Sequence, residues 1–491
     1  MDAARACVAP CAHPPPSPLL SWVEHDPAEI LRSVELCAGG ALAAARASGA
    51  PARVVAVGVA NQRETTVAWD SVTGLPLCNA IVWNDARTGG VCAGVEAAHG
   101  GRDAFRAATG LPVSPYFSAY KMRWMLDNVD AVRDAAAKGT LRFGTVDSWL
   151  VWSLTGGASG GGAHVTDATN ASRTGLLDIA SLTWHAPTCG AMGVDPAWLP
   201  AVASSAERYG AVAAGPLAGA PLTGILGDQQ AALLGQRCRP GDAKATFGTG
   251  AFVLLVTGPT PPPSAHGLLT TVAYKLGPDA DALYALEGAV AVAGAGVTWL
   301  VDGLAALDAP SSIGAVADSV PSSGGLILVP AFGGLLAPRW RADARGALLG
   351  VTAGTTRAHV CRAMLDAIAW QTREVTDAMA EDAAVIGAPG LASLRVDGGA
   401  AACDALMRIQ ADALGVAVVR PPHGETTSLG AALAAGVGAG VWSAEAAFSV
   451  GAGAKPTVFA RTADAATIEA RYAKWKLAVE RTYGLAALTD E

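Results

Sequence analysis

Residues 223–236 read TGILGDQQAALLGQ, and this stretch predicts a short strand, a glycine turn and a helix that opens at Asp228. A carboxylate in this position has two interpretations. It caps the start of the helix, which is a common role of Asp. Alternatively, it is a general base that takes the proton of a substrate hydroxyl as that oxygen attacks phosphorus. The stretch by itself leaves both roles open.

Further strands and helices are predicted both before and after residues 223–236. Residues 53–60, RVVAVGVA, are a Val-rich run typical of a strand covered on both faces. Residues 244–258 predict two strands around a glycine turn, and residues 391–415 predict a strand, a Gly-Gly turn and a helix. Asp26, followed by Pro and later Glu, predicts a helix start. Residues 465–483 predict an amphipathic helix. The pattern is that of an α/β protein.

Length and composition limit the class of protein. A chain of 491 residues predicts more than one domain. The 51% of hydrophobic residues and 15% of charged residues exclude a disordered chain. A net charge of −8 argues against nucleic acid as a general partner, because phosphate binding needs clustered cations. The most apolar stretches, residues 288–301 and 430–442, are shorter than the ~20 residues of a membrane-spanning helix, so no membrane span is predicted.

The predicted organisation is an irregular segment over residues 1–20, a first domain over 21–238 and a second over 239–491, with a cleft between the domains for ligands. Nine scattered cysteines suit a reducing compartment such as the cytoplasm. No secretory signal is evident in the first twenty residues, and organelle targeting stays open.

Arg63 and Glu64 closely follow the strand predicted over residues 53–60, at the end where α/β sheets commonly bind ligands. A guanidinium donates hydrogen bonds and a carboxylate accepts them, so together they can hold neighbouring hydroxyls of a polyol. A surface salt bridge explains these two residues about equally well. Trp83, Tyr116 and Phe252 are single aromatic residues, for which core packing is the default interpretation.

Three glycine turns, at residues 227–228, 248–250 and 398–399, could expose backbone N–H groups to an anion. Each could equally be a plain tight turn in a chain with 58 glycines. No Walker-type phosphate loop is present in the sequence, so a phosphate site here must be of another type.

Taken together, these segments resemble the glycerol kinases of the FGGY carbohydrate-kinase family. The resemblance runs from about residue 21 to nearly the C-terminus. It is carried by stretches such as GVANQRETTVAWD (58–70), HVTDATNASRTGLLDI (164–179), GDQQAALLGQ (227–236), FGTGAFVLLVTG (247–258) and LRVDGGAAACDALMRIQADALG (394–415). NQRETT together with GDQQAA points to the glycerol enzymes over the xylulose, gluconate or fuculose members.

The resemblance implies two sugar-kinase/actin-like (ribonuclease H-like) α/β domains with mixed sheets flanking a central cleft. It implies MgATP-dependent phosphorylation of glycerol to sn-glycerol 3-phosphate, with ATP and Mg²⁺ as cofactors and Asp228 as catalytic base. The implied glycerol contacts are Arg63, Glu64, Trp83, Tyr116, Asp228, Gln229 and Phe252. The implied nucleotide contacts are Thr249, Gly294, Thr298, Gly399 and Cys403. No residue of this chain is assigned to the metal, and a homo-oligomer stays open.

The sequence departs from the family in three places. A first strand, a phosphate loop DQGTTSSR and two more strands precede the counterpart of WVEHDP (22–27), and residues 1–20 contain none of them. We therefore expect the first domain to lack its N-terminal strands, so that residues 53–60 lose a neighbour and become an exposed apolar edge, and the chain to be insoluble or only partly folded. Thr298 stands where the family often has Gln, and Cys403 where it usually has Asn. Three alternatives stay open: a catalytically impaired glycerol-binding homologue, a chain with an incomplete N-terminal segment, and a kinase for another polyol.

Overall fold

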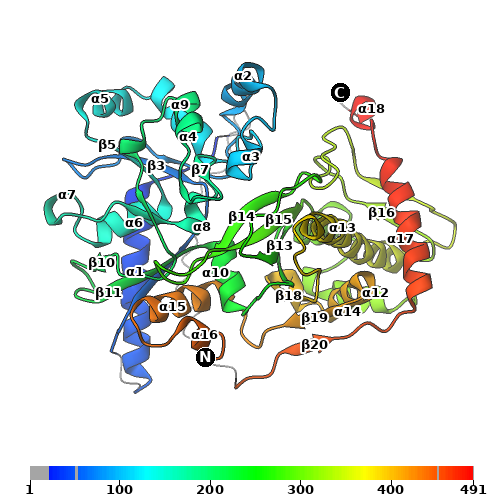
Figure 1. The fold of residues 1–491 in the computed structure, drawn as a ribbon. Helices are drawn as coiled ribbons and strands as arrows, with labels where there is room; N and C mark the ends of the chain where they lie inside the picture. The colour runs from blue at the N-terminus through cyan, green and yellow to red at the C-terminus, as the bar shows by residue number, and fades with distance from the viewer. Residues whose placement is uncertain (1–21, 50–52, 451–452, 490–491) are drawn as a thin grey trace. The chain divides into compact units, whose positions relative to one another are not determined.

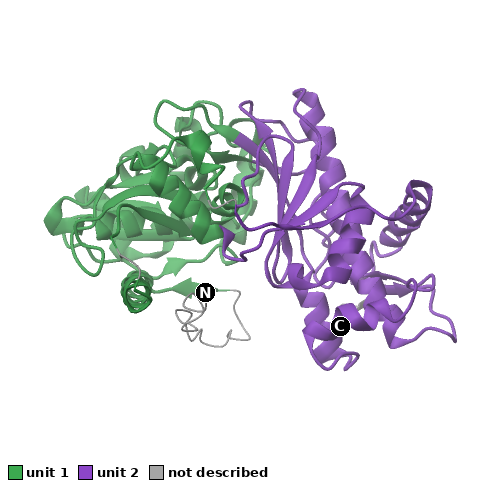
Figure 2. Cartoon of the chain, turned by 90° about the horizontal axis from the view of Figure 1, so that it is seen from below, with its two compact units in different colours: residues 1–235, 271–283, 427–450 green, residues 236–270, 284–426, 451–491 purple. Residues whose placement is uncertain are grey.

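The computed structural model describes residues 22–49, 53–450 and 453–489, so the irregular segment expected over residues 1–20 lies outside the described part. The chain forms two compact units, shown in green and purple in Figure 2. Unit 1 contains residues 1–235, 271–283 and 427–450, and unit 2 contains residues 236–270, 284–426 and 451–491. Strands and helices mix in both units, as the α/β prediction requires (Figure 1).

The strands of unit 1 are β1 (Glu24–His25), β2 (Val57–Asn61), β3 (Thr66–Asp70), β4 (Ala80–Ile81), β5 (Leu141–Thr145), β6 (Val165–Asp167), β7 (Leu177–Asp178), β8 (Thr183–Trp184), β9 (Ala201–Ala203), β10 (Gly210–Ala211) and β11 (Pro221–Gly227). Its helices are α1 (Pro27–Ala47), α2 (Gly89–His99), α3 (Arg106–Thr109), α4 (Ser118–Asn128), α5 (Asp130–Lys138), α6 (Val146–Leu154), α7 (Gly157–Gly160), α8 (Ala168–Ala171), α9 (Ala186–Met192), α10 (Asp228–Gly235) and α16 (Ala444–Ala447). Helix α15 (Thr426–Gly438) begins at Thr426, the last residue of the unit 2 segment 284–426, and continues in unit 1.

The strands of unit 2 are β12 (Asp242–Phe247), β13 (Ala251–Gly258), β15 (Leu283–Val290), β16 (Ile327–Val329), β17 (Ala347–Leu349), β18 (Ser393–Asp397), β19 (Ala417–Arg420) and β20 (Thr457–Phe459). The division between the units falls within β14 (Leu269–Tyr274). The helices of unit 2 are α11 (Gly294–Thr298), α12 (Ile313–Asp318), α13 (Arg357–Val385), α14 (Asp404–Leu414), α17 (Ala465–Glu480) and α18 (Ala486–Thr489).

A mixed sheet in unit 1 places the candidate site. Its strand order is β10-β11-β2, and β2 runs parallel to β11 with Asn61 opposite Gly227. Both parallel strands therefore end at the same edge, and the residues that follow them, Arg63 and Asp228, emerge there together. Strand β2 begins at Val57, later than predicted, because β11 begins at Pro221, which has no N–H to extend the ladder.

A cluster of tryptophans forms the core beneath this sheet. Trp69, Trp149 and Trp152 lie with ring centroids 5.6–5.8 Å apart, and Val59 of β2 packs into the same cluster. Trp149 Nε1 donates a hydrogen bond to the carbonyl of Pro27 at 2.8 Å, which ties α1 to α6. The predicted start of α1 is confirmed, because Asp26 Oδ1 accepts from the Ala28 N–H.

Helix α15 belongs with unit 1 because glycines let its backbone pack directly against neighbouring backbone. A Cβ on Gly430 would lie 1.8 Å from the Ala231 carbonyl oxygen, and a Cβ on Gly58 would lie 2.2 Å from that of Ala431. Thr223 Oγ1 adds a hydrogen bond to the Ala435 carbonyl. The structural division therefore differs from a single boundary at 238/239: residues 271–283 and 427–450 return to unit 1.

The main sheet of unit 2 is also mixed. Strands β12, β18 and β19 are parallel, and β13, β15 and β20 pair antiparallel in the order β15-β13-β12-β18-β19-β20. The strand–turn–strand predicted over residues 244–258 and the strand–turn–helix predicted over 391–415 are confirmed. The predicted C-terminal helix ends at Glu480, and its apolar side chains are buried: Ile468, Tyr472, Trp475 and Val479.

The packing of α15 predicts opposite effects for one substitution at two helical glycines. We expect Gly430→Ala to lower the free energy of unfolding by roughly 2 kcal/mol or more, because the new methyl has no room against α10. Gly94→Ala, at an exposed position of α2 with open space around it, should raise that free energy by up to about 1 kcal/mol. Urea unfolding of both variants checks this, and equal effects would contradict the packing argument.

Candidate active site

The turn after β2 points two charged side chains into the interior of unit 1. Glu64 has a backbone φ of 59°, and the Thr65 N–H donates to the Arg63 carbonyl at 2.6 Å, which makes a tight and strained turn. Two hydroxyls, from Thr66 and Ser118, donate to the Glu64 carbonyl. Arg63 is 3% exposed and Glu64 is 1% exposed. The surroundings thus hold a backbone conformation that a non-glycine residue rarely adopts.

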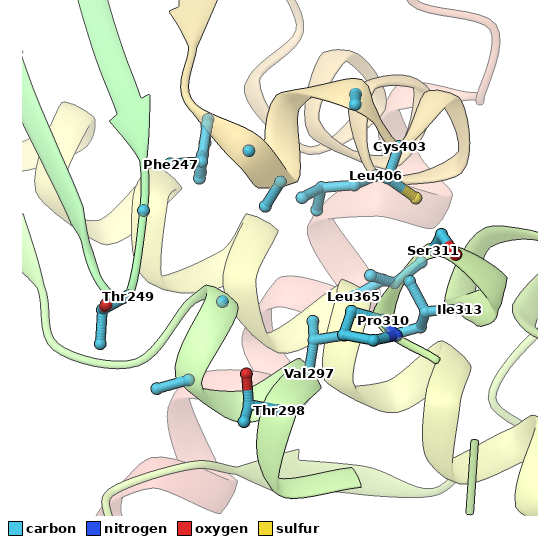
Figure 3. Close-up of a pocket in the computed structure, with 16 residues that line it drawn as sticks. Phe247, Thr249, Val297, Thr298, Pro310, Ser311, Ile313, Leu365, Cys403 and Leu406 are labelled. Atoms are coloured by element: carbon cyan, nitrogen blue, oxygen red, sulfur yellow. The ribbon is translucent and has the colours of Figure 1, made fainter. Parts of the chain in front are cut away.

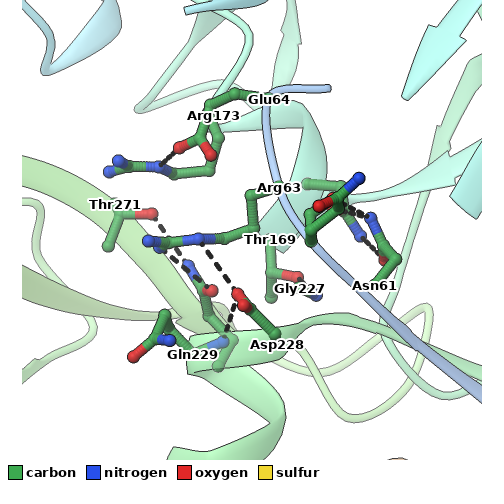
Figure 4. Close-up of polar contacts among 12 residues, drawn as sticks. Asn61, Arg63, Glu64, Thr169, Arg173, Gly227, Asp228, Gln229 and Thr271 are labelled. Carbon is green, nitrogen blue, oxygen red and sulfur yellow. Dashed lines mark hydrogen bonds and ion pairs between the residues drawn. The ribbon is translucent and has the colours of Figure 1, made fainter. Parts of the chain in front are cut away.

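Each of these two side chains has a distant partner (Figure 4). Arg173 Nε donates to Glu64 Oε1 at 2.6 Å, and both side chains are buried. Arg63 Nε lies 3.4 Å from Asp228 Oδ1, and its Nη1 donates to Gln230 Oε1 at 3.3 Å. A surface salt bridge between Arg63 and Glu64 was therefore the wrong alternative, because both residues are buried and pair elsewhere.

Asp228 stands at the first position of α10, as predicted. Its Oδ1 accepts the Gln229 N–H at 2.7 Å and faces Arg63. The side chain is 38% exposed, so the carboxylate is both held by the helix start and open to a ligand. Gln229 is buried beside it. The two interpretations of Asp228, a helix-start acceptor and an accessible base, are compatible in this geometry.

Two half-buried aromatic rings lie near the turn. Trp83 and Tyr116 meet edge to face with centroids 5.7 Å apart, and the Arg173 guanidinium lies 5.6 Å from the centre of the Tyr116 ring. The Trp83 N–H donates to Thr65 Oγ1 at 3.2 Å. Six of the seven predicted glycerol contacts thus belong to unit 1. Phe252 lies on β13 of unit 2, so its part in that set stays a prediction.

The lysine at position 121 supports Tyr116 from the interior. Lys121 is fully buried on α4, and its Nζ donates to the Tyr116 carbonyl at 2.5 Å. Burial lowers the pKa of Lys121 to about 7, although Glu64 and Asp85 act in the opposite direction. Sequence reasoning missed both Lys121 and Arg173. A buried Glu64 demands a cation, but nothing local in the sequence says that the cation lies 109 residues away.

A second candidate site is a pocket of about 710 Å³ within unit 2 (Figure 3). It is lined by Phe247, Gly248, Thr249, Gly294, Ala295, Val297, Thr298, Pro310, Ser311, Ile313, Leu365, Gly399, Ala400, Ala402, Cys403 and Leu406. The structure brings all five predicted nucleotide contacts together in this pocket. They come from the β12–β13 turn, from α11, and from the turn between β18 and α14.

Backbone packing shapes one side of this pocket. The Gly294 N–H donates to the Gly248 carbonyl at 2.9 Å, and a Cβ on Gly294 would lie 2.5 Å from that oxygen. Gly398 has a φ of 86°, and a Cβ there would lie 2.5 Å from the Phe247 carbonyl oxygen. Apolar side chains line much of the rest. Burial raises the pKa of the Cys403 thiol, which therefore remains neutral at ordinary pH.

Neither a metal centre nor a membrane segment is evident in the described residues. They contain no group of three or more His, Cys, Asp or Glu side chains placed to hold a metal ion. No helix in residues 22–49, 53–450 or 453–489 combines the length and apolar character that crossing a membrane requires.

Comparison with known proteins finds matches over nearly the whole chain. The N-terminal domain of the FGGY family of carbohydrate kinases matches residues 7–235, and the C-terminal domain of that family matches residues 243–439. A glycerol kinase of Arabidopsis thaliana is 49% identical over 481 residues, 96% of this chain and 92% of that protein. A glycerol kinase of Roseiflexus sp. (strain RS-1) is 49% identical over 468 residues, 95% of this chain and 92% of that protein.

Solved structures give the same picture. The crystal structure of Plasmodium falciparum glycerol kinase with ADP has a TM-score of 0.88 at 35% identity, and the match covers 94% of this chain and 90% of that one. A gluconate kinase from Lactobacillus acidophilus has a TM-score of 0.80 at 21% identity, covering 97% of this chain and 92% of that one, and shares the fold.

The buried Lys121 predicts a pH-dependent stability. Its folded pKa of about 7 lies below the ordinary 10.5, so the unfolded chain binds more protons between these values. The cost of the buried charge is fully present below pH 7 and disappears as pH rises toward 10.5. Relative to Lys121→Met, the native chain should therefore gain free energy of unfolding from pH 7 to 9, by at most ~1.4 kcal/mol per pH unit.

Urea unfolding at both pH values measures this difference. Lys138→Met, at the exposed end of α5, is the matched control and should show no pH-dependent difference from the native chain. A difference between Lys121→Met and the native chain that stays constant with pH would contradict the prediction.

Proposed function

Because the chain belongs to the FGGY family of carbohydrate kinases, we propose that it is a glycerol kinase, which transfers the γ-phosphoryl group of ATP to glycerol and forms sn-glycerol 3-phosphate and ADP. The family and structure matches confirm two predictions from the sequence: the resemblance to this family, and a fold of two sugar-kinase/actin-like α/β domains with mixed sheets. The observation that carries the proposal is the exposed carboxylate of Asp228 beside buried Arg63, at the same sheet edge as buried Glu64.

The polyol would be bound by complementary hydrogen bonds. Arg63 can only donate and the Glu64 carboxylate can only accept, so the pair matches neighbouring hydroxyls, each of which does both. The Arg173–Glu64 contact holds the buried carboxylate in place, and a buried carboxylate needs such a charged partner. Trp83 and Tyr116 are placed to pack on the carbon atoms, and Gln229 to add a polar contact. Phe252 is proposed as a further apolar contact from unit 2.

Asp228 is proposed as the general base. As the terminal hydroxyl oxygen forms a bond to the γ-phosphorus, its proton passes to the Asp228 carboxylate, and the bond from the γ-phosphorus to the bridging oxygen breaks to release ADP. Arg63, whose Nε lies 3.4 Å from Oδ1 of this carboxylate, would orient it for the transfer. The 38% exposure of the Asp228 side chain leaves room for the hydroxyl.

The pocket of unit 2 is proposed as the nucleotide site. Its volume of about 710 Å³ falls within the range usual for ligand pockets, roughly 300–1,000 Å³. Thr249 would meet the phosphates, while Gly294, Thr298, Gly399 and Cys403 would border the adenosine. Mg²⁺ would supply charge neutralisation of the phosphates, and this ion takes most of its ligands from phosphate and water oxygens rather than from a protein cage.

Glycerol-dependent ADP release with MgATP tests the proposal. We expect Asp228→Asn to lower kcat by ~10²-fold or more with glycerol affinity largely kept, because the amide cannot accept the proton. Asp464→Asn is the matched control, since Asp464 also stands at a helix start and Asn caps helices equally well. Unchanged turnover in Asp228→Asn would remove Asp228 from the mechanism. Turnover of a larger polyol in place of glycerol would contradict the substrate assignment.

The nucleotide assignment has a separate test. We expect Cys403→Phe to raise the KM for ATP by roughly 10-fold, because the ring fills part of the pocket, while the KM for glycerol stays unchanged. Cys37→Phe, at an exposed position of α1, is the matched control. Equal KM values for ATP in the two variants would place the nucleotide elsewhere.

A further inference from the structure

The segment from Asp167 to Arg173, which includes α8, contacts the turn after β2 and the last residue of β11, next to Asp228 (Figure 4). Three of its side chains reach outward. Thr169 Oγ1 accepts the Gly227 N–H at 2.9 Å, Asn170 and Asn61 exchange two amide hydrogen bonds of 2.9 and 3.1 Å, and Arg173 pairs with Glu64. Two of these contacts hold the turn after β2, and one holds the turn after β11.

The Thr169 contact is directional. Its hydroxyl donates to Asp167 Oδ1 at 2.9 Å, so its remaining lone pairs face the Gly227 N–H. Asp167 is fully buried and also accepts from the Thr169 and Asn170 N–H groups and from Ser205 Oγ. Burial and the neighbouring Asp147 raise the pKa of Asp167 to about 7.

Gly227 is the last residue before Asp228, and it has little freedom to shift. A Cβ at this position would lie 2.7 Å from Cγ of Arg63, so the Gly227 backbone already packs against the Arg63 side chain. A movement of the Gly227 N–H would therefore turn Asp228 away from its 3.4 Å contact with Arg63.

We propose that Thr169 is a positioning residue for the catalytic base: its hydroxyl, oriented by Asp167, fixes the Gly227 N–H and thereby the direction of the Asp228 carboxylate. This inference rests on the proposed role of Asp228. It separates the work of the segment into two parts. Arg173 holds Glu64, a proposed polyol contact, and Asn170 holds Asn61 just before the same turn, whereas Thr169 holds Gly227, the residue before the proposed base.

The test compares variants of the full chain. We expect Thr169→Val, which replaces the hydroxyl by a methyl of similar size, to lower kcat by roughly 10-fold or more. The dissociation constant for glycerol, measured by calorimetry without ATP, should stay within about 3-fold, because the Thr169 hydroxyl bonds to Gly227 and Asp167, which are not among the proposed glycerol contacts. Thr169→Ser, which keeps the hydroxyl, should restore most of kcat. Thr372→Val, a buried threonine on α13 of unit 2, is the matched control.

A double-mutant cycle with Asp228→Asn distinguishes a positioning role from a general loss of stability. If Thr169 acts through Asp228, Thr169→Val should lower kcat of the Asp228→Asn variant by less than about 2-fold. A full kcat in Thr169→Val, or an equal loss in both backgrounds, overturns the inference. High turnover in Asp228→Asn instead contradicts the proposed function, and the two failures are thus distinguishable.

Two further experiments apply if Thr169→Val does not fold or if the variants turn over too slowly to measure. Thr169→Cys, whose thiol is a weak acceptor of similar size, replaces the valine variant if that variant does not fold, and the same loss of kcat is expected. A crystal structure of Thr169→Val or Thr169→Cys, whichever folds, should show the Asp228 carboxylate turned away from Arg63. In the structure of Thr169→Ser the carboxylate should keep its place. An unmoved carboxylate would overturn the inference.

Discussion

The carboxylate of Glu64 and the guanidinium of Arg173 are both buried, with 2.6 Å between Oε1 and Nε. Taking two charges out of water costs several kcal/mol per ion, and only their mutual attraction and further hydrogen bonds offset that cost. The contact therefore has to form for the turn after β2 to fold as it does. This turn holds Glu64 at a φ of 59°, and it directs Arg63 toward Asp228. The geometry of the polyol site in unit 1 follows from this pair.

The pair does not stand by itself, since further charged groups are buried close to it. Lys121 lies near Glu64 and Asp85, and Arg87 pairs with Asp85 at 2.7 Å. Burying hydrophobic residues of similar size would cost less free energy than burying these charged side chains. Such buried charges would serve ligand binding, because the hydroxyls of a polyol need donors and acceptors that are already in position. These groups lose their water when the chain folds, so binding a ligand does not require that desolvation a second time.

Local structure was readable from the sequence because its signals are local. The helix start at Asp26 and the strand, turn and helix of residues 223–236 depend on neighbours within a few positions, and both are confirmed. Long-range partners gave no such signal. Arg173 lies within a stretch already noted for its resemblance, but its contact with Glu64 depends on how α8 packs against the turn after β2. The return of residues 427–450 to unit 1 likewise depends on backbone contacts that no periodicity encodes.

The two candidate sites differ in the kind of atoms that recognise the ligand, and this predicts where each tolerates change. In unit 1, most of the proposed polyol contacts are charged or polar side chains, and exchanging Glu64 or Arg173 removes the buried ion-pair partner of the other. In unit 2, backbone turns shape one side of the pocket and apolar side chains form much of the rest of its wall. If this pocket holds the nucleotide as proposed, a wall residue such as Thr298 or Cys403 could differ from the family pattern and still pack against the adenine ring. Gly294 and Gly398 cannot, because the space for a Cβ is already occupied by a carbonyl oxygen. The departures in this chain at positions 298 and 403 thus fall where the chemistry of the pocket is least demanding.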